Sequence, residues 1–385
     1  MITKLKNCNI LTNTSKNVLF GTEILVCDNK IKQIGKSAST MQTDLEIDLN
    51  GALVIPGLNN MFCFPYSLDM NFDNLVNSTE YDSSISYVKN KLEDNFNFEK
   101  FSNKLVSNGV TSSYLVDVQV FKNLSAEKLR LGYFISIDEN LKDGYQVLKK
   151  EIEKLLNHSS LKPILLINHI LDLNDDDIST LIEIAKNFDL TIAVRIAKTL
   201  DDSGEIDKQT GMSPISYLES LGILDRKCLL LDCTVLDKED INILSLYENV
   251  SLALSVQSDM ILGNGVAPLC AFLNKNINVV LGLDNLACSN LDMFREMYLA
   301  KNLQSVAMAD SNAVSAEDIF KLATSNFEAV FEQKIGKIEE GYLADLIAIR
   351  NDRIDYNNIY DSIINLVDGN DVELTMINGE IVYKK

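Results

Sequence analysis

Eight short apolar runs, most of them separated by amphipathic stretches, constrain the fold of this 385-residue chain more than any other feature. The intervening stretches include "YQVLKKEIEKLLN" and "DISTLIEIAKNF", whose apolar residues recur at helical spacing. A strand followed by a helix, repeated eight times, is typical of a (β/α)8 barrel. The eight runs are "ALVIPGL", "VTSSYLVDV", "LRLGYFISID", "KPILLINH", "DLTIAVRI", "CLLLDCTV", "VSLALSVQ" and "NINVVLGLD".

The two ends of the chain have a different pattern, in which short alternating strands are joined by tight turns. Asp28-Asn29 and Asn378-Gly379 each lie between such strands and are typical of β-hairpin tips. Because strands at one terminus alone could not bury a face, both termini are expected to contribute to one small β-sandwich. The predicted fold is α/β: residues 1–53 plus 339–385 form a composite β-sandwich domain, and residues 54–338 form the (β/α)8 TIM barrel.

Charge and composition exclude several classes of partner. The formal net charge is -20 and the pI is about 4.5, which disfavours binding to nucleic acid or to an anionic membrane. No signal peptide and no long apolar run is recognisable, so no membrane anchor is expected. The seven cysteines form an odd set without a CxxC pair, which favours a reducing compartment. The chain is therefore predicted to be cytoplasmic.

Polar chemistry in a barrel of this kind is expected at the carboxyl ends of the strands. The chain has only two histidines, His158 and His169, so a site that needs three or four imidazole rings is excluded. The residues that follow the first, fourth, fifth, sixth and eighth predicted strands are Phe62 and Phe64, His169, Arg195, Asp232 and Asp284.

Six segments, in order and correctly spaced over nearly the whole chain, resemble one known family. They are similar to motifs of the amidohydrolase superfamily, in the branch that holds cytosine, guanine and S-adenosylhomocysteine deaminases and triazine hydrolases. The first of them matches that branch's P-G-L-x-N-x-H-x-H pattern except at the histidines. The segments are "VIPGLNNMFCF", "LINHILDLNDDDI", "GMSPISYLESLGILDRKCLLLDC", "GNGVAPLCAFLNKNINVVLGLDN", "NLDMFREMYLA" and "IGKIEEGYLADLIAI".

The resemblance implies a metal-dependent hydrolase acting on non-peptide C–N bonds, with Zn²⁺ or Fe²⁺ activating a water molecule. In the family, two histidines after strand 1, one after strand 5, one after strand 6 and an aspartate after strand 8 hold the ion. A glutamate after strand 5 moves protons. Carried onto this chain, the four histidines fall on Phe62, Phe64, Arg195 and Asp232, and the glutamate falls on Lys198. Only Asp284 matches, so no metal cofactor is expected.

A retained carboxylate in a metal-free pocket needs another positive charge, because an unpaired buried charge costs several kcal/mol. We expect the guanidinium of Arg195 to occupy the place of the ion and to bridge Asp232 and Asp284 by charge-assisted hydrogen bonds, with Lys198 nearby. A Mg²⁺ site between the two aspartates is the disfavoured alternative, because two cations are close. His169 falls on the family's substrate-contacting histidine, and both a ligand contact and a structural role remain open.

Three functions remain as hypotheses. The first is a pseudoenzyme that has lost metal-dependent hydrolysis but binds a small heterocycle or nucleoside in a pocket made by Arg195, Lys198, Asp232 and Asp284. The second is an active hydrolase or deaminase that uses these residues and His169 as an unconventional site. The third is a structural or partner subunit of an active paralogue. The resemblance also implies a homodimer or a hetero-oligomer with a paralogue.

Overall fold

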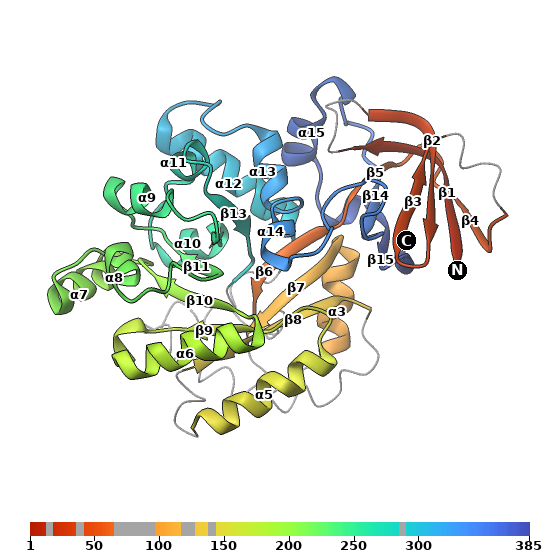
Figure 1. Cartoon of the computed structure of the whole chain (residues 1–385). Coiled ribbons are helices and arrows are strands. Elements are labelled where there is room, and N and C mark those ends of the chain that lie inside the picture. The colour runs from red at the N-terminus through yellow and green to blue at the C-terminus, as the bar shows by residue number, and fades with distance from the viewer. Residues whose placement is uncertain (13–17, 36–41, 65–96, 117–127, 138–143, 285–289) are drawn as a thin grey trace.

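The computed structural model describes residues 1–12, 18–35, 42–64, 97–116, 128–137, 144–284 and 290–385, which form two sheets with surrounding helices (Figure 1). One sheet has the strand order β13-β12-β11-β10-β9-β8-β7-β6, and every neighbouring pair in it is parallel. A bridge between Cys63 and Asp284 joins its two edges. The predicted (β/α)8 barrel is therefore confirmed.

The barrel strands are β6 (Leu58–Cys63), β7 (Val110–Val116), β8 (Arg130–Ser136), β9 (Ile164–Ile167), β10 (Thr191–Ile196), β11 (Cys228–Asp232), β12 (Val250–Leu254) and β13 (Asn278–Leu281). The helices around them are α3 (Phe98–Ser107), α5 (Tyr145–His158), α6 (Asp175–Phe188), α7 (Leu200–Thr210), α8 (Pro214–Ser220), α9 (Lys238–Leu244), α10 (Val256–Leu262), α11 (Leu269–Asn274), α12 (Met293–Met308), α13 (Ala316–Leu322) and α14 (Phe327–Phe331).

The second sheet is built from both termini, which lie side by side in Figure 1. Its order is β16-β15-β14-β5-β1-β2-β3, with β4 paired to β1. Both predicted hairpins are present, because Cys27 pairs with Lys30 and Ile377 pairs with Glu380. The strands are β1 (Ile2–Leu11), β2 (Val18–Cys27), β3 (Lys30–Ile34), β4 (Leu45–Asp48), β5 (Leu53–Pro56), β14 (Leu346–Ile349), β15 (Val372–Ile377) and β16 (Glu380–Lys384); helix α15 (Ile359–Leu366) connects β14 to β15.

The first predicted run, "ALVIPGL", needs correction, because it is not one barrel strand. Its residues Leu53–Pro56 form β5 and pair with β1 and β14 in the terminal sheet, whereas the first barrel strand β6 begins at Leu58. Phe62 accordingly lies inside a strand and not after it. Gly57 permits the change of sheet, since a Cβ there would lie 2.3 Å from Cγ2 of Thr111 on β7. Periodicity could not separate the two strands because both are buried apolar runs.

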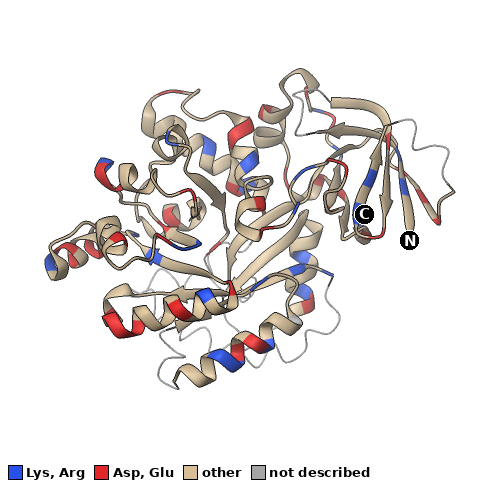
Figure 2. Ribbon diagram, in the orientation of Figure 1, with Lys and Arg blue, Asp and Glu red and all other residues tan. Residues whose placement is uncertain are grey.

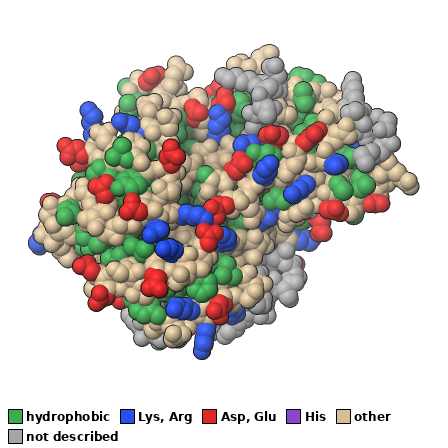
Figure 3. All heavy atoms as spheres, in the orientation of Figure 1, with side chains coloured by type: hydrophobic (Ala, Val, Ile, Leu, Met, Phe, Trp, Pro, Cys, Tyr) green, Lys and Arg blue, Asp and Glu red, His purple; other side chains and the backbone are tan. Residues whose placement is uncertain are grey.

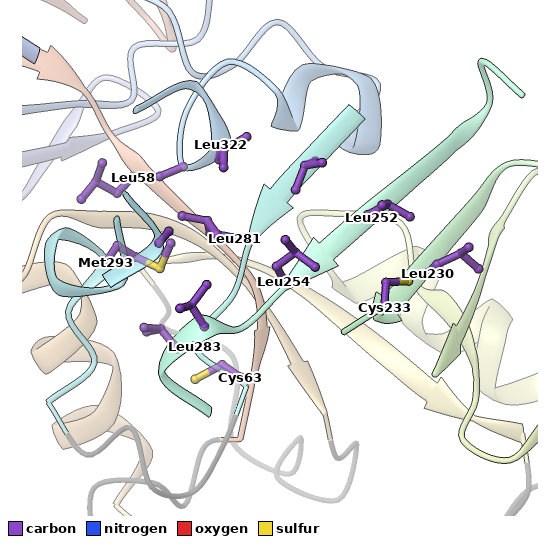
Figure 4. Packing of buried hydrophobic residues seen from close by; sticks show 14 of the residues in the cluster. Leu58, Cys63, Leu230, Cys233, Leu252, Leu254, Leu281, Leu283, Met293 and Leu322 are labelled. Carbon is purple, nitrogen blue, oxygen red and sulfur yellow. The ribbon is translucent and has the colours of Figure 1, made fainter. Parts of the chain in front are cut away.

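Alternation along the strands divides the barrel core into two layers. On β11, Leu229 and Leu231 belong to the cluster inside the barrel, while Leu230 belongs to the larger cluster between strands and helices. Figure 4 shows Leu230, Leu252 and Leu281 of this outer layer on three neighbouring strands. The strands are buried on both faces, as expected for a parallel sheet covered by helices.

Charged side chains gather on the outer helices and are few on the barrel strands (Figure 2). At the start of α6, the Asn174 side chain accepts the N–H of Asp177 at 3.0 Å in a capping box, and the acidic first turn complements the helix dipole. In Figure 3, acidic and basic side chains are mixed over the visible face. In the described part of the chain, no helix has the length and apolar character needed to cross a bilayer.

A buried ion pair joins the barrel to the terminal sheet. Arg130, at the start of β8, donates from Nη2 to both carboxylate oxygens of Asp345 at 3.1 and 2.8 Å, and from Nε at 3.2 Å. The two side chains are only 6% and 1% exposed. Asn378 completes the cluster, because its backbone N–H donates to Asp345 and its Oδ1 accepts from Arg130. The junction between the two sheets is therefore polar, buried and hydrogen-bonded.

Candidate active site at the barrel mouth

Arg195, near the end of β10, bridges the two aspartates at the carboxyl ends of β11 and β13. Its Nε donates to Asp232 Oδ2 at 2.9 Å, and its Nη2 donates to Asp232 Oδ1 and Asp284 Oδ1, each at 3.2 Å. The side chains of Arg195, Asp232 and Asp284 are 11%, 5% and 3% exposed. The predicted salt bridge between strands 5, 6 and 8 is confirmed.

The backbone at these strand ends adopts unusual conformations. Ala197, Asp232, Cys233 and Asp284 have positive φ angles of 51°, 74°, 51° and 40°. Asp284 is held further by backbone hydrogen bonds, since its N–H donates to Phe62 O at 2.7 Å and its C=O accepts from Phe64 at 3.2 Å. Left-handed conformations of non-glycine residues persist where the surroundings fix them, and they cluster at functional sites. The barrel thus holds its mouth in a strained geometry.

Electrostatics favour the ionised form of Asp232 despite its burial. Desolvation alone would raise the pKa of this carboxyl, but the positive charges of Arg195 and Lys198 and the hydrogen bonds from Arg195 leave the pKa below its usual value. Lys198 is half-buried just beyond β10. The sequence-predicted group of Arg195, Lys198, Asp232 and Asp284 is therefore brought together in the structure.

The two phenylalanines at the predicted metal positions form an apolar surface against the guanidinium. Phe62 and Phe64 are 2% and 4% exposed, and their ring centroids lie 5.7 Å apart at 83°. Phe62 also packs on Phe134 of β8 at 5.0 Å. The Cζ atom of Arg195 lies 4.9 Å from the centroid of the Phe62 ring, within the range of a cation–π contact.

These side chains do not fit the divalent ion that the family resemblance implies. Phenyl rings offer no ligand atoms, and the Arg195 cation already occupies oxygens of both aspartates. Within the described ranges, no group of three or more His, Cys, Asp or Glu side chains is arranged to hold a metal ion. The described side chains at this mouth therefore do not supply a ligand set for such an ion.

His169 lies at the carboxyl end of a barrel strand, on the same rim. It follows β9 and precedes the 3-10 turn η4 (Ile170–Asp172), and its side chain is exposed. Its neighbour Asn168 donates to Ser136 Oγ at 3.0 Å. A role for His169 as a ligand contact stays a prediction.

Three residues near the bridge, Ser258, Asp259 and Glu296, were not predicted from the sequence. Ser258 Oγ donates to Asp284 Oδ2 at 2.9 Å, and Asp259 follows it on α10. Glu296 of α12, fully buried, accepts the backbone N–H groups of Val256 and Gln257 and so fixes the start of α10. For Ser258 and Asp259 the signal was their position directly after the seventh apolar run, because residues after a barrel strand face the mouth.

Burial strongly raises the pKa values of Asp259 and Glu296. Desolvation raises the pKa of Asp259 to about 7, assisted by the negative charges of Asp232 and Asp284 and opposed by Asn264 and Lys198. Desolvation likewise raises the pKa of Glu296 to about 8, against the two backbone N–H groups that it accepts. Groups whose pKa lies near neutrality are common at functional sites.

Replacing Glu296 with glutamine is expected to make the protein more stable than wild type at alkaline pH. Because the folded-state pKa of Glu296 is raised from 4.5 to about 8, its contribution to stability is fully present below pH 4.5 and is lost as the pH rises through 8. The Glu296→Gln variant cannot ionise there. The difference in the free energy of unfolding should grow to a few kcal/mol, up to about 4, between about pH 5 and pH 8.

Urea titrations at pH 5, 7 and 8.5 measure this difference, with the exposed Glu153→Gln on α5 as the control. The Glu153→Gln curve should follow wild type at each pH. A constant offset between Glu296→Gln and wild type across the range would contradict the raised pKa.

Fold and site together define the class of this protein: a (β/α)8 barrel whose polar site lies at the carboxyl ends of its strands, flanked by a sheet made from both termini. The chain belongs to the amidohydrolase family, whose sequence profile matches residues 106–382.

Curated relatives include deaminases of adenine nucleosides. The chain is 29% identical to a 5-methylthioadenosine/S-adenosylhomocysteine deaminase of Pyrococcus furiosus over 94% of this chain and 90% of that protein. It is 34% identical to the enzyme of the same name from Pyrococcus abyssi over 66% of this chain and 61% of that protein. A 5'-deoxyadenosine deaminase of Methanopyrus kandleri matches at 33% identity over 52% of this chain and 48% of that protein.

Solved structures confirm the fold. An adenosine deaminase from Xanthomonas campestris with bound zinc aligns with a TM-score of 0.84 at 18% identity, covering 99% of this chain and 92% of that chain. A guanine deaminase from C. acetobutylicum with bound guanine aligns with a TM-score of 0.83 at 19% identity, covering the whole of both chains. At such identities the likeness concerns the fold alone.

Proposed function

We propose that this protein binds a small heterocycle or nucleoside at the barrel mouth and has lost the metal-dependent hydrolysis of C–N bonds. The observation that carries the proposal is the bridge from Arg195 to Asp232 and Asp284. A guanidinium balances the two carboxylates there, and Phe62 and Phe64 supply apolar surface in place of ligand atoms. The ligand class is suggested by the names of the relatives, which act on adenine nucleosides.

A second candidate is an active deaminase or hydrolase with an unconventional site. The relatives from P. furiosus, P. abyssi and M. kandleri favour this candidate more directly than the first, since all three are deaminases, at 29–34% identity. In this case Asp259, whose pKa is raised to about 7, would be the group suited to proton transfer near pH 7. Arg195 would then stabilise negative charge while remaining paired.

Metal content and ammonia release separate the two candidates. For the first we expect less than about 0.1 Zn or Fe per chain by elemental analysis, well below the stoichiometric ion of a catalytic zinc site. We also expect no ammonia from adenosine, 5-methylthioadenosine or S-adenosylhomocysteine, with or without added metal. The P. furiosus relative, assayed alongside, is the positive control. Ammonia release by this protein at a rate above the buffer blank would move the conclusion to the second candidate.

Ligand binding is tested by thermal shift. A nucleoside at 100 times its dissociation constant should stabilise the fold by about 2.7 kcal/mol. If no purine, pyrimidine or nucleoside in a test panel stabilises the fold, the third hypothesis is favoured, in which the protein is a partner subunit of an active paralogue.

The homodimer or hetero-oligomer remains a proposal, and light scattering of the purified protein measures its oligomeric state. The six described cysteines are free, which supports a reducing compartment such as the cytoplasm.

A further inference from the structure

A cavity of about 470 Å³ lies away from the barrel mouth, where the end of α3 meets the start of α12 and the end of α15. None of the three residues of the Arg195 bridge lines it. Sites for small molecules usually have volumes of about 300 to 1,000 Å³. The cavity is therefore large enough for a small ligand of its own.

Hydrogen bonds between distant segments fix the wall of this cavity. Asn108, 3% exposed at the end of α3, donates from Nδ2 to the C=O groups of Asn290 and Leu291 at 2.8 and 2.9 Å. Asp292 accepts the backbone N–H of Gly369 at 3.0 Å. A Cβ on Gly369 would lie 2.3 Å from Asn108 Oδ1, so only glycine permits this contact. A wall that is already ordered lowers the free-energy cost of binding a ligand.

Three cationic side chains line the cavity and retain unused hydrogen-bond donors. The Arg295 guanidinium is exposed and makes no ion pair within the described ranges. Arg353 donates from Nη2 to the C=O of Leu366 at 3.0 Å, and Lys104 donates to Asn108 Oδ1 at 3.1 Å. Since a guanidinium has five N–H donors and an ammonium has three, several remain for a ligand.

The carboxylates in the same wall are already used by the backbone. Asp292 accepts the N–H of Phe294 at 2.9 Å with the oxygen that does not bond to Gly369. Asp368 accepts the N–H of Asn370 at 2.7 Å. Three cations against two carboxylates give the cavity a net positive charge, in a chain whose formal net charge is -20. The wall thus offers mainly donors, which suits a ligand whose atoms accept hydrogen bonds.

We propose that this cavity binds a small organic dianion, a phosphate monoester or a dicarboxylate, whose oxygens accept hydrogen bonds from Arg295, Arg353 and Lys104. The planar guanidinium matches the oxygens of both groups. Tyr298, 44% exposed in the same wall, offers an aromatic face to the carbon part of the ligand. The site is separate from the barrel mouth, so it does not rest on the proposed function.

Calorimetric titration of the whole protein with phenyl phosphate, succinate and phenol tests the site. The titrations are made in about 0.15 M chloride, which screens diffuse attraction of anions. We expect at least one of the two dianions to bind saturably, at one per chain, and neutral phenol to bind far more weakly. Tighter binding of phenyl phosphate would identify the ligand as a phosphate monoester, and tighter binding of succinate as a dicarboxylate.

The double variant Arg295→Met, Arg353→Met locates the bound dianion. Its Kd should rise at least about 10-fold, because two charge-assisted hydrogen-bonding groups are lost. Arg226→Met, Lys275→Met is the matched control, since it removes two exposed positive charges elsewhere on the surface. Its Kd should stay within about 2-fold of wild type, because charges beyond a Debye length are largely screened.

Melting curves check that both double variants are folded, which is expected because all four substituted side chains are exposed. Saturable binding of neither dianion by the wild-type protein would overturn the proposal. A smaller rise in Kd for Arg295→Met, Arg353→Met, or an equal rise in the control, would overturn it as well.

Discussion

Replacing Arg195 with methionine is expected to lower the free energy of unfolding by about 3–5 kcal/mol at pH 7, because it leaves two buried carboxylates without their cation. Asp232 and Asp284 are 5% and 3% exposed, so water cannot take over the missing hydrogen bonds. Urea denaturation followed by circular dichroism measures the loss. The penalty should shrink as the pH falls toward 4, since the stranded carboxyls then take up protons.

Two further variants decide whether the loss comes from stranded charge. The triple variant Arg195→Met, Asp232→Asn, Asp284→Asn removes the charges together and should recover most of the lost stability, since neutral groups are cheaper to bury. Arg226→Met removes an exposed arginine and should change stability by less than about 0.5 kcal/mol. If Arg195→Met unfolds with the free energy of wild type, Arg195 does not balance the aspartates and the basis of the proposed function fails.

The second large effect is expected at the junction between the barrel and the terminal sheet. Arg130→Met and Asp345→Asn should each destabilise the protein by about 3–5 kcal/mol, because each leaves the other charge buried at 6% exposure or less. The double variant should lose much less than the sum, with a coupling energy of roughly 2 kcal/mol or more. A double-mutant cycle from urea denaturation gives this number.

The surface pair Arg350–Glu373 is the matched control for this cycle. Its contact is as short, 2.7 Å against 2.8 Å, but the two side chains are 40% and 35% exposed. Exposed pairs couple by about 1 kcal/mol or less. Equal coupling in the two cycles would show that burial does not govern the Arg130–Asp345 pair.

The site was predictable to the extent that charge balance determined it. A retained aspartate with no metal ligands around it requires a cation, and Arg195 at the end of the fifth apolar run was the candidate that the structure places there. Ser258 and Glu296 were missed for different reasons. Ser258 lies past the end of an apolar run, whereas Glu296 reaches α10 from a helix 40 positions further along the chain, which no local pattern reveals.

By itself, the sequence determined the alternation of strand and helix, the hairpins at both ends and the residues at most strand ends, because periodicity and turn residues are local properties. Only the tertiary structure decided that Leu53–Pro56 joins the terminal sheet and that the barrel begins at Leu58. It also decided that Asp259, in the helix after the seventh barrel strand, lies buried where Asp232 and Asp284 act on it electrostatically. Such choices depend on which distant surfaces meet, and burial and hydrogen bonding across those contacts have no counterpart in neighbouring residues.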